Sequence, residues 1–266
     1  MRSRSALLLA IASVYLSVCA DTARAADPKV PAGRDPGGVA VAIIGGGLDY
    51  RRETTASRLA RDGEGEPIGW DFVDGDRYPF AASGGVDPVA AIVMAASKAR
   101  LVPVRVTAGS EPQIVQALRL LDETPTRIVV LAATAAPIAR SNLTAASRQL
   151  SRMLMVVPAR IVAPMSSATS PTEDAAGLLV VSASGDGRQA DLIVEAGSAS
   201  DADPSSSATE SAHPDDLAAA RVAALAARLA SLGSISAGPM LRARILELAH
   251  PRADGAKILS GIDRLP

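Results

Sequence analysis

The chain has 266 residues and a formal net charge of −1, and 48% of its residues are hydrophobic although only 2% are aromatic. A near-neutral charge gives no reason to expect a nucleic-acid or an anionic-membrane partner. The single cysteine excludes an internal disulfide framework and any metal site built from several cysteines. Length and apolar content together indicate one or two globular domains that fold unaided.

The N-terminus has the pattern of a secretory signal peptide. Two arginines precede the apolar run Leu7–Ala20, which is too short to span a membrane comfortably, and Ala23–Ala25 supplies small residues at a cleavage site. We therefore expect residues 1–25 to be removed and the mature protein to be periplasmic or secreted. A lipoprotein signal ending at Cys19 is the alternative. No later stretch predicts an integral membrane span.

Residues 26–37 are expected to form an N-terminal extension, and residues 38–266 the folded domain. Short apolar runs predict strands, and longer stretches with helical spacing predict helices. In chain order, the expected elements are a strand at Gly38–Ile44, a helix at Glu53–Arg61, a strand at Gly69–Val73, a helix at Val86–Ala99, a strand at Leu101–Val106, a helix at Pro112–Leu121, a strand at Arg127–Ala132, a helix at Asn142–Arg152, strands at Met153–Val157, Leu178–Ser182 and Ala190–Val194, and helices at Asp215–Leu232 and Met240–Ala249. The Ser/Ala/Asp-rich segment at about 196–213 predicts an irregular surface loop. This alternation indicates an α/β fold whose mainly parallel sheet is covered on both sides.

The three glycines Gly45–Gly47 follow the first expected strand, as in the opening of a dinucleotide-binding turn. That motif needs a third, later glycine so that the next helix packs closely on the strand. Tyr50 occupies this position, and its ring would block the approach. A strand followed by a turn explains the glycines without a ligand, and nucleotide binding through Gly45–Gly47 is kept as an alternative.

Several segments, taken in order, resemble the subtilisin-like serine peptidase family. They are Val41–Tyr50 (VAIIGGGLDY), Gly69–Phe80 (GWDFVDGDRYPF), Gly85–Ile92 (GVDPVAAI), Leu101–Val106 (LVPVRV), Ile114–Ala133, Val156–Ile161 (VVPARI) and Pro214–Leu229 (PDDLAAARVAALAARL). The resemblance runs from about Gly38 to Ala249. It implies a three-layer α/β/α sandwich with a mainly parallel central sheet.

The family's catalytic positions carry other residues in this chain. The resemblance places the aspartate at Gly45, the histidine at Gly85, the oxyanion asparagine at Ile161 and the nucleophilic serine at Asp216. A shifted alignment would place the serine at Glu210 and the asparagine near Ser166.

These replacements remove the chemistry of the family. A serine hydroxyl is a weak nucleophile unless a histidine, held by a third group, takes its proton. Glycine has no side chain for either role, and isoleucine donates no hydrogen bond to an oxyanion. Asp216 stands at a predicted helix start, where the helix dipole favours a carboxylate and a capping role. We therefore expect no peptidase activity.

The two histidines, His213 and His250, are the remaining candidates for a base. Ser211, His213 and the carboxylates of Asp215 and Asp216 superficially assemble a Ser-His-Asp set. Residues i and i+2 of an extended segment, however, point to opposite faces. The following proline and acids are instead typical of a helix N-terminus. A residual or altered hydrolase using these residues is the alternative, and His250 is expected at the surface.

A run of three aspartates, Asp71, Asp74 and Asp76, offers oxygens that a calcium ion accepts. Their spacing fails the EF-hand pattern, and Asp-Gly is ordinary turn chemistry. We expect no metal ion and no cofactor.

Apart from Tyr15, every aromatic residue lies between Tyr50 and Phe80. Because binding sites are usually rich in tyrosine and tryptophan, exposed members of this group are the first candidates for contact with a partner. Trp70 and Phe72 are expected to fill the core. The sequence thus predicts an exported, inactive subtilisin-like protein with a binding or scaffold role toward a protein or peptide.

Overall fold

The computed structural model describes residues 27–81, 86–96, 98–132, 137–164, 176–183, 190–195, 212–233, 237–252, 256–262 and 265. The predicted signal peptide lies outside the described residues, as does most of the segment predicted to be an irregular loop. Within the described residues, no helix is both long enough and apolar enough to cross a membrane.

Helices and strands alternate along the chain, as the hydrophobic pattern predicts. In order they are β1 (Val39–Gly45), α2 (Glu53–Ala56), β2 (Trp70–Asp71), α3 (Pro88–Ala95), β3 (Ala99–Arg105), α4 (Glu111–Asp122), β4 (Thr126–Leu131), α5 (Arg140–Gln149), β5 (Leu154–Pro158), η1 (Ala159–Ile161), β6 (Leu178–Ser182), β7 (Leu192–Val194), α6 (Pro214–Ser231), α7 (Gly238–Leu248), β8 (His250–Pro251) and β9 (Lys257–Leu259).

The strands form one sheet in the order β2-β3-β1-β4-β5-β6-β7-β9-β8. Every pair is parallel except β8 with β9, which is antiparallel. Parallel strands need crossover connections, and α-helices lie between successive strands from β1 to β5 and again between β7 and β8. The expected α/β fold with a mainly parallel sheet is confirmed.

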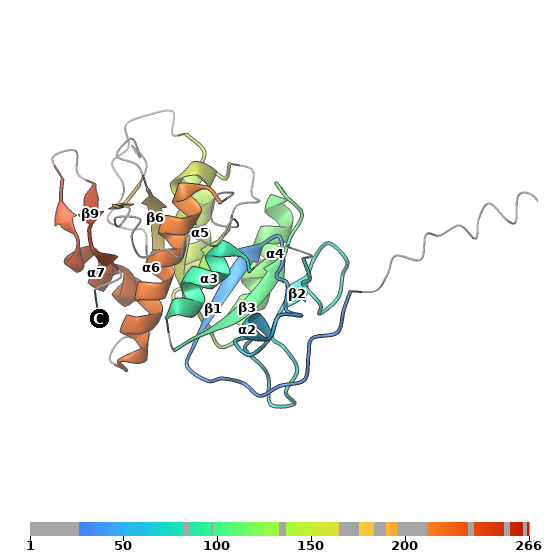
Figure 1. The fold of residues 1–266 in the computed structure, drawn as a ribbon. Coiled ribbons are helices and arrows are strands. Elements are labelled where there is room, and N and C mark those ends of the chain that lie inside the picture. The colour runs from blue at the N-terminus through green and yellow to red at the C-terminus, as the bar shows by residue number, and fades with distance from the viewer. Residues whose placement is uncertain are drawn as a thin grey trace, which may run out of the picture.

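Both faces of the sheet are buried, so the strands are apolar on both sides. In β1, Val41 and Ile43 face one core, while Ala42 and Ile44 face the other. The first core also receives the buried residues of α3, α6 and α7, and the second those of α4 and α5. Figure 1 shows α3 and α6 together over one face of the sheet. The result is the three-layer sandwich that the resemblance implies.

Helix α6 runs through the middle of its layer and is rich in buried alanine. Small side chains let it approach the sheet closely, and it packs against β1, β4, β5 and β6. Pro214 occupies its first turn, where a missing N–H costs no hydrogen bond. The N-terminus of α6 lies at the edge where the parallel strands end, because Asp215 in its first turn accepts hydrogen bonds from Ser182 and Ala183 at the end of β6.

The helix expected at Glu53–Arg61 is much shorter, since α2 ends at Ala56. The residues after it pair with β3 instead: the N–H of Leu101 donates to Arg58, and that of Ala60 to Leu101, both at 2.7 Å. Strand-like pairing of buried residues overrides the helical spacing here. The short strands β8 and β9 were not expected, and His250, expected at the surface, is exposed within β8.

Pro103 lies inside β3, although proline cannot donate to a ladder. The N–H of Leu101 points away from β1, toward Arg58, and Pro103 has the same orientation two residues on. Strand β2 pairs only with Val104 and Arg105. The nitrogen of Pro103 therefore faces the β2 side of β3, at a position before the hydrogen bonds between β2 and β3 begin.

Residues 27–37, which cover most of the expected N-terminal extension, have no helix or strand but pack on the domain. The hydroxyl of Tyr50 donates to the carbonyl of Pro28 at 2.7 Å, and the N–H of Arg61 donates to Asp35 at 2.7 Å. Arg100 forms an ion pair with the same Asp35 carboxylate. Val30 adds an apolar contact with the core.

Candidate functional site

Three of the four catalytic positions implied by the resemblance lie where the parallel strands end. Gly45 is the last residue of β1, Ile161 ends the 3₁₀ turn η1 directly after β5, and Asp216 lies in the first turn of α6. Binding sites of open parallel sheets lie at this edge. Gly85 lies outside the described residues.

An ion pair occupies the start of α6. The guanidinium of Arg160, from η1, donates through Nε to Oδ1 of Asp216 and through Nη2 to Oδ2, both at 3.0 Å. The side chain of Asp216 is 1% exposed and that of Arg160 is 24% exposed. Two parallel hydrogen bonds fix the relative orientation of both groups. Both carboxylate oxygens are therefore engaged.

Asp215, the preceding residue, is held by the end of β6. Its Oδ1 accepts hydrogen bonds from the hydroxyl of Ser182 at 3.1 Å and from the N–H of Ala183 at 2.8 Å. Asp215 is 7% exposed. The two neighbouring carboxylates thus tie α6 to two different strand ends.

His213 is the N-cap of α6, and its Nδ1 accepts from the N–H of Asp215 at 3.2 Å. The expectation that Asp216 caps the helix is therefore wrong: the imidazole takes the free N–H, and Asp216 turns to Arg160. In a Ser-His-Asp triad the corresponding nitrogen carries a proton that it donates to the aspartate. Ser211, the third member of the alternative triad, lies outside the described residues.

Asp87 brings a further carboxylate to this edge from α3. It is the N-cap of that helix and accepts from the N–H of Ala90 at 2.9 Å. Burial raises the pKa of Asp87, and the nearby negative charge of Asp216 acts in the same direction. The starts of α3 and α6, which pack together, therefore both carry acidic side chains.

The glycine turn after β1 is shaped by packing. A Cβ at Gly45 would lie 3.1 Å from the Cβ of Ala132, and one at Gly47 would lie 2.7 Å from the carbonyl oxygen of Pro79. Gly47 also has a φ of +92°, which favours glycine. The turn closes against Pro79 and leads to α2, a single turn of helix, so the glycines are explained without a nucleotide.

Ile161 is 1% exposed and belongs to the core on the α4 side of the sheet. Its carbonyl accepts from the N–H of Ile138 at 2.7 Å. Ser166 and Glu210, the positions given by the shifted alignment, lie outside the described residues. The polar side chain that η1 presents to α6 is that of Arg160.

A second group of charges surrounds Arg105 at the end of β3. Its guanidinium lies 2.8 Å from Asp71 and 2.6 Å from Asp74. Carboxylate oxygens of Asp27, Asp71 and Asp76 lie within 4.8 Å of one another. Burial, and then the charge of Asp74, raises the pKa of Asp27. The aspartates expected to form a turn do so, and they also form an ion-pair cluster around Arg105.

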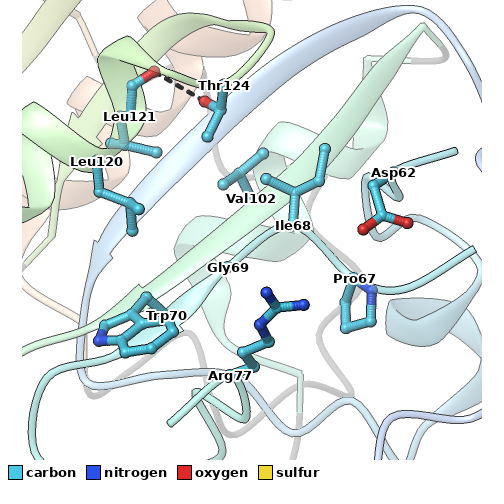
Figure 2. A pocket seen from close by; sticks show the side chains of 10 residues that line it. All are labelled: Asp62, Pro67, Ile68, Gly69, Trp70, Arg77, Val102, Leu120, Leu121 and Thr124. Carbon is cyan, nitrogen blue, oxygen red and sulfur yellow. Dashed lines mark hydrogen bonds between the residues drawn. The ribbon is translucent and has the colours of Figure 1, made fainter. Parts of the chain in front are cut away.

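Of the aromatic group, Tyr50 is fully buried and packs edge-on against Phe80, with ring centroids 5.4 Å apart. Phe72 packs on the core on the α4 side, as expected. Trp70 does not fill the core: it is partly exposed and lines a pocket (Figure 2).

Arg160 and Asp87 were not predicted as part of the site. Arg160 lies two residues after a buried strand and just before an apolar residue, and a charge at such a place needs a partner, so this signal could have been found. For Asp87, the sequence Asp-Pro before an apolar helix is a typical N-cap pattern.

Comparisons with known proteins bear on the fold. No family model matches the chain, and no curated protein matches it. Among solved structures, it is similar to a cold-adapted subtilisin-like serine proteinase, with 14% identity, a TM-score of 0.52, and coverage of 88% of this chain and 92% of that one. It is also similar to the A-subunit of the AB5 toxin from E. coli, with 11% identity, a TM-score of 0.50, and coverage of 84% and 90%. The chain thus has a subtilisin-like fold.

Proposed function

We propose that this chain is an exported subtilisin-like protein that lacks peptidase activity and acts as a binding or scaffold protein for a protein or peptide partner. One observation supports the proposal: Asp216, at the position to which the resemblance assigns the nucleophilic serine, is a buried carboxylate that is ion-paired through both oxygens. Export rests on the signal-peptide pattern of residues 1–25.

The Asp216–Arg160 pair is unsuited to acyl transfer. The family's reaction needs a hydroxyl that a neighbouring base activates, whereas Asp216 offers a carboxylate held by two hydrogen bonds from one guanidinium. An oxyanion forming beside Asp216 would meet like charge, and Asp87 adds a second acid nearby. The imidazole of His213 is occupied as a helix cap.

The test of inactivity is labelling with a fluorophosphonate probe, which reacts with an activated serine. The mature chain and an active subtilisin, at equal concentration, are treated with the probe and assayed on peptide and ester panels. We expect labelling and hydrolysis by the subtilisin alone. Labelling of this chain would overturn the proposal, and hydrolysis abolished by His213→Ala would support the altered hydrolase instead.

The test of export is expression of the full chain with N-terminal sequencing of the product. We expect it outside the cytoplasm, beginning near Ala26. Recovery of full-length chain in the cytoplasm would contradict export and leave the assignment of inactivity standing.

A further inference from the structure

A pocket of about 200 Å³ lies beside β2 and β3, under the C-terminal end of α4 (Figure 2). Val102 and Leu121, two of its lining residues, belong to the core on the α4 side of the sheet. Helix α6 packs on the other core. The pocket is therefore separate from the Asp216–Arg160 site, and its occupancy is tested independently of peptidase activity.

The floor and walls of the pocket are apolar. They comprise Ile68, Leu120 and the ring of Trp70, which are partly exposed, and behind them Val102 and Leu121, which are fully buried. The indole is partly exposed, so it offers a flat face to a ligand. Such a lining favours a small branched or aromatic side chain.

Two opposite charges face this apolar space. Arg77 and Asp62 both line the pocket, and Figure 2 shows their charged ends directed into it from different sides. Within the described part of the chain, the guanidinium of Arg77 makes no hydrogen bond or ion pair. Asp62 uses one oxygen, Oδ1, to accept the N–H groups of Glu64 and Glu66 at 2.9 and 3.0 Å. Among those same residues its Oδ2 has no partner.

We propose that this pocket binds a free apolar α-amino acid such as leucine or phenylalanine. Arg77 binds the carboxylate, Asp62 binds the ammonium group, and the side chain lies on the apolar floor beside Trp70. The volume is below that of pockets for drug-sized ligands, which fits a molecule of this size.

The charge distribution favours a zwitterion over a simple anion or cation. Asp62, Glu64 and Glu66 make the loop beside the pocket acidic, which repels a ligand carrying only a carboxylate. Arg77 in turn repels a ligand carrying only an ammonium group. A free amino acid satisfies both charges from one carbon atom, whereas the end of a peptide carries only one of them.

Trp70 is the sole tryptophan of the chain, so its fluorescence reports on the pocket without background. We expect L-leucine and L-phenylalanine to change the Trp70 emission saturably and to give a matching binding isotherm by calorimetry. N-acetyl-leucine, which lacks the ammonium group, and leucinamide, which lacks the carboxylate, should bind at least about tenfold more weakly, as expected when a charged hydrogen bond is lost.

Variants locate the site. Arg77→Gln and Asp62→Asn should each weaken leucine binding at least about tenfold; asparagine retains the oxygen that holds the loop. Arg119→Gln, an exposed arginine on α4 that does not line the pocket, is the control and should bind as the wild type does.

Three outcomes would overturn the proposal. They are no saturable signal by either method, equal binding of N-acetyl-leucine or leucinamide (which would indicate a peptide end), and unchanged leucine affinity of Arg77→Gln. None of them bears on peptidase activity, so this proposal fails or stands independently of the proposed function.

Discussion

The guanidinium of Arg160 and the carboxylate of Asp216 meet through two hydrogen bonds of 3.0 Å, although the residues are 56 positions apart. The pair is unequally buried, because Asp216 is 1% exposed and Arg160 is 24% exposed. The carboxylate therefore depends on its partner for solvation more than the guanidinium does.

This difference in burial predicts that removing Arg160 and removing Asp216 lower the free energy of unfolding by unequal amounts. Arg160→Met leaves a buried carboxylate unpaired and should lower the free energy of unfolding by about 3 kcal/mol. Asp216→Asn leaves an arginine that can turn to water and should cost about 1 kcal/mol. Urea unfolding at neutral pH measures both.

The control is the exposed pair Arg244–Glu247, whose side chains are 49% and 63% exposed. Arg244→Met should change the free energy of unfolding by less than about 0.5 kcal/mol. Equal costs for Arg160→Met and Arg244→Met would show that the pair at α6 contributes no more than a surface contact.

Asp87 predicts a pH dependence of stability. Burial, with the charge of Asp216, raises its pKa above the ordinary value of 3.8. A raised folded-state pKa means that the folded protein binds the proton more tightly than the unfolded chain does. The stability contributed by protonated Asp87 is therefore fully present below the ordinary carboxyl pKa and is lost as the pH rises through the folded-state value.

Asp87→Asn tests this directly, since the amide keeps an acceptor for the N–H of Ala90. The free energy of unfolding of the variant, minus that of the wild type, should increase between about pH 3.5 and pH 7. Urea titrations across this range measure the difference. A difference that is constant or falls with pH would contradict the assigned direction.

The sequence predicted most of the fold because hydrophobic spacing reports local structure. The runs at Val39–Gly45 and Leu178–Ser182 are apolar on both faces, and a buried parallel strand requires that. Hydrophobic spacing gave a wrong prediction where pairing with a distant strand determines the local structure. Leu59, for example, forms a bridge to Leu101 in place of the expected helix. The two-residue strand β8 gives no periodic pattern to find.

The site was less predictable, because its contacts join distant residues. Gly45 and Asp216 were placed through the resemblance, and both lie at the edge where the parallel strands end. Asp216 pairs with Arg160, and His213 accepts from a backbone N–H. Both contacts depend on which strand end faces α6. A single sequence does not show which strand end faces α6.

The close approach of α7 to the start of β5 predicts how much a methyl group added at Gly238 lowers the free energy of unfolding. A Cβ at Gly238 would lie 2.0 Å from the carbonyl oxygen of Met153, which is backbone and cannot rotate away. Gly238→Ala should therefore lower the free energy of unfolding by about 3 kcal/mol. At Gly63 a Cβ would meet nothing within 4 Å, so Gly63→Ala should stay within about 0.5 kcal/mol of the wild type in the same urea assay. Similar values for both variants would mean that α7 does not approach β5 this closely.

Replacing Asp216 by serine tests whether the absence of a serine at this position would alone account for the proposed inactivity. Asp216→Ser supplies a hydroxyl at the start of α6 but no base, since Nδ1 of His213 is engaged by the helix and the resemblance assigns the aspartate position to Gly45. An aspartate at position 45 would place its Cβ 3.1 Å from the Cβ of Ala132, so Ala132 would have to shift slightly to admit it. We expect Asp216→Ser to show no fluorophosphonate labelling and no ester hydrolysis above the wild type. Because the variant also frees Arg160, circular dichroism must confirm that it is folded. Labelling of the folded variant would mean that a base lies within reach of position 216, and the carboxylate alone would then separate this chain from an active hydrolase.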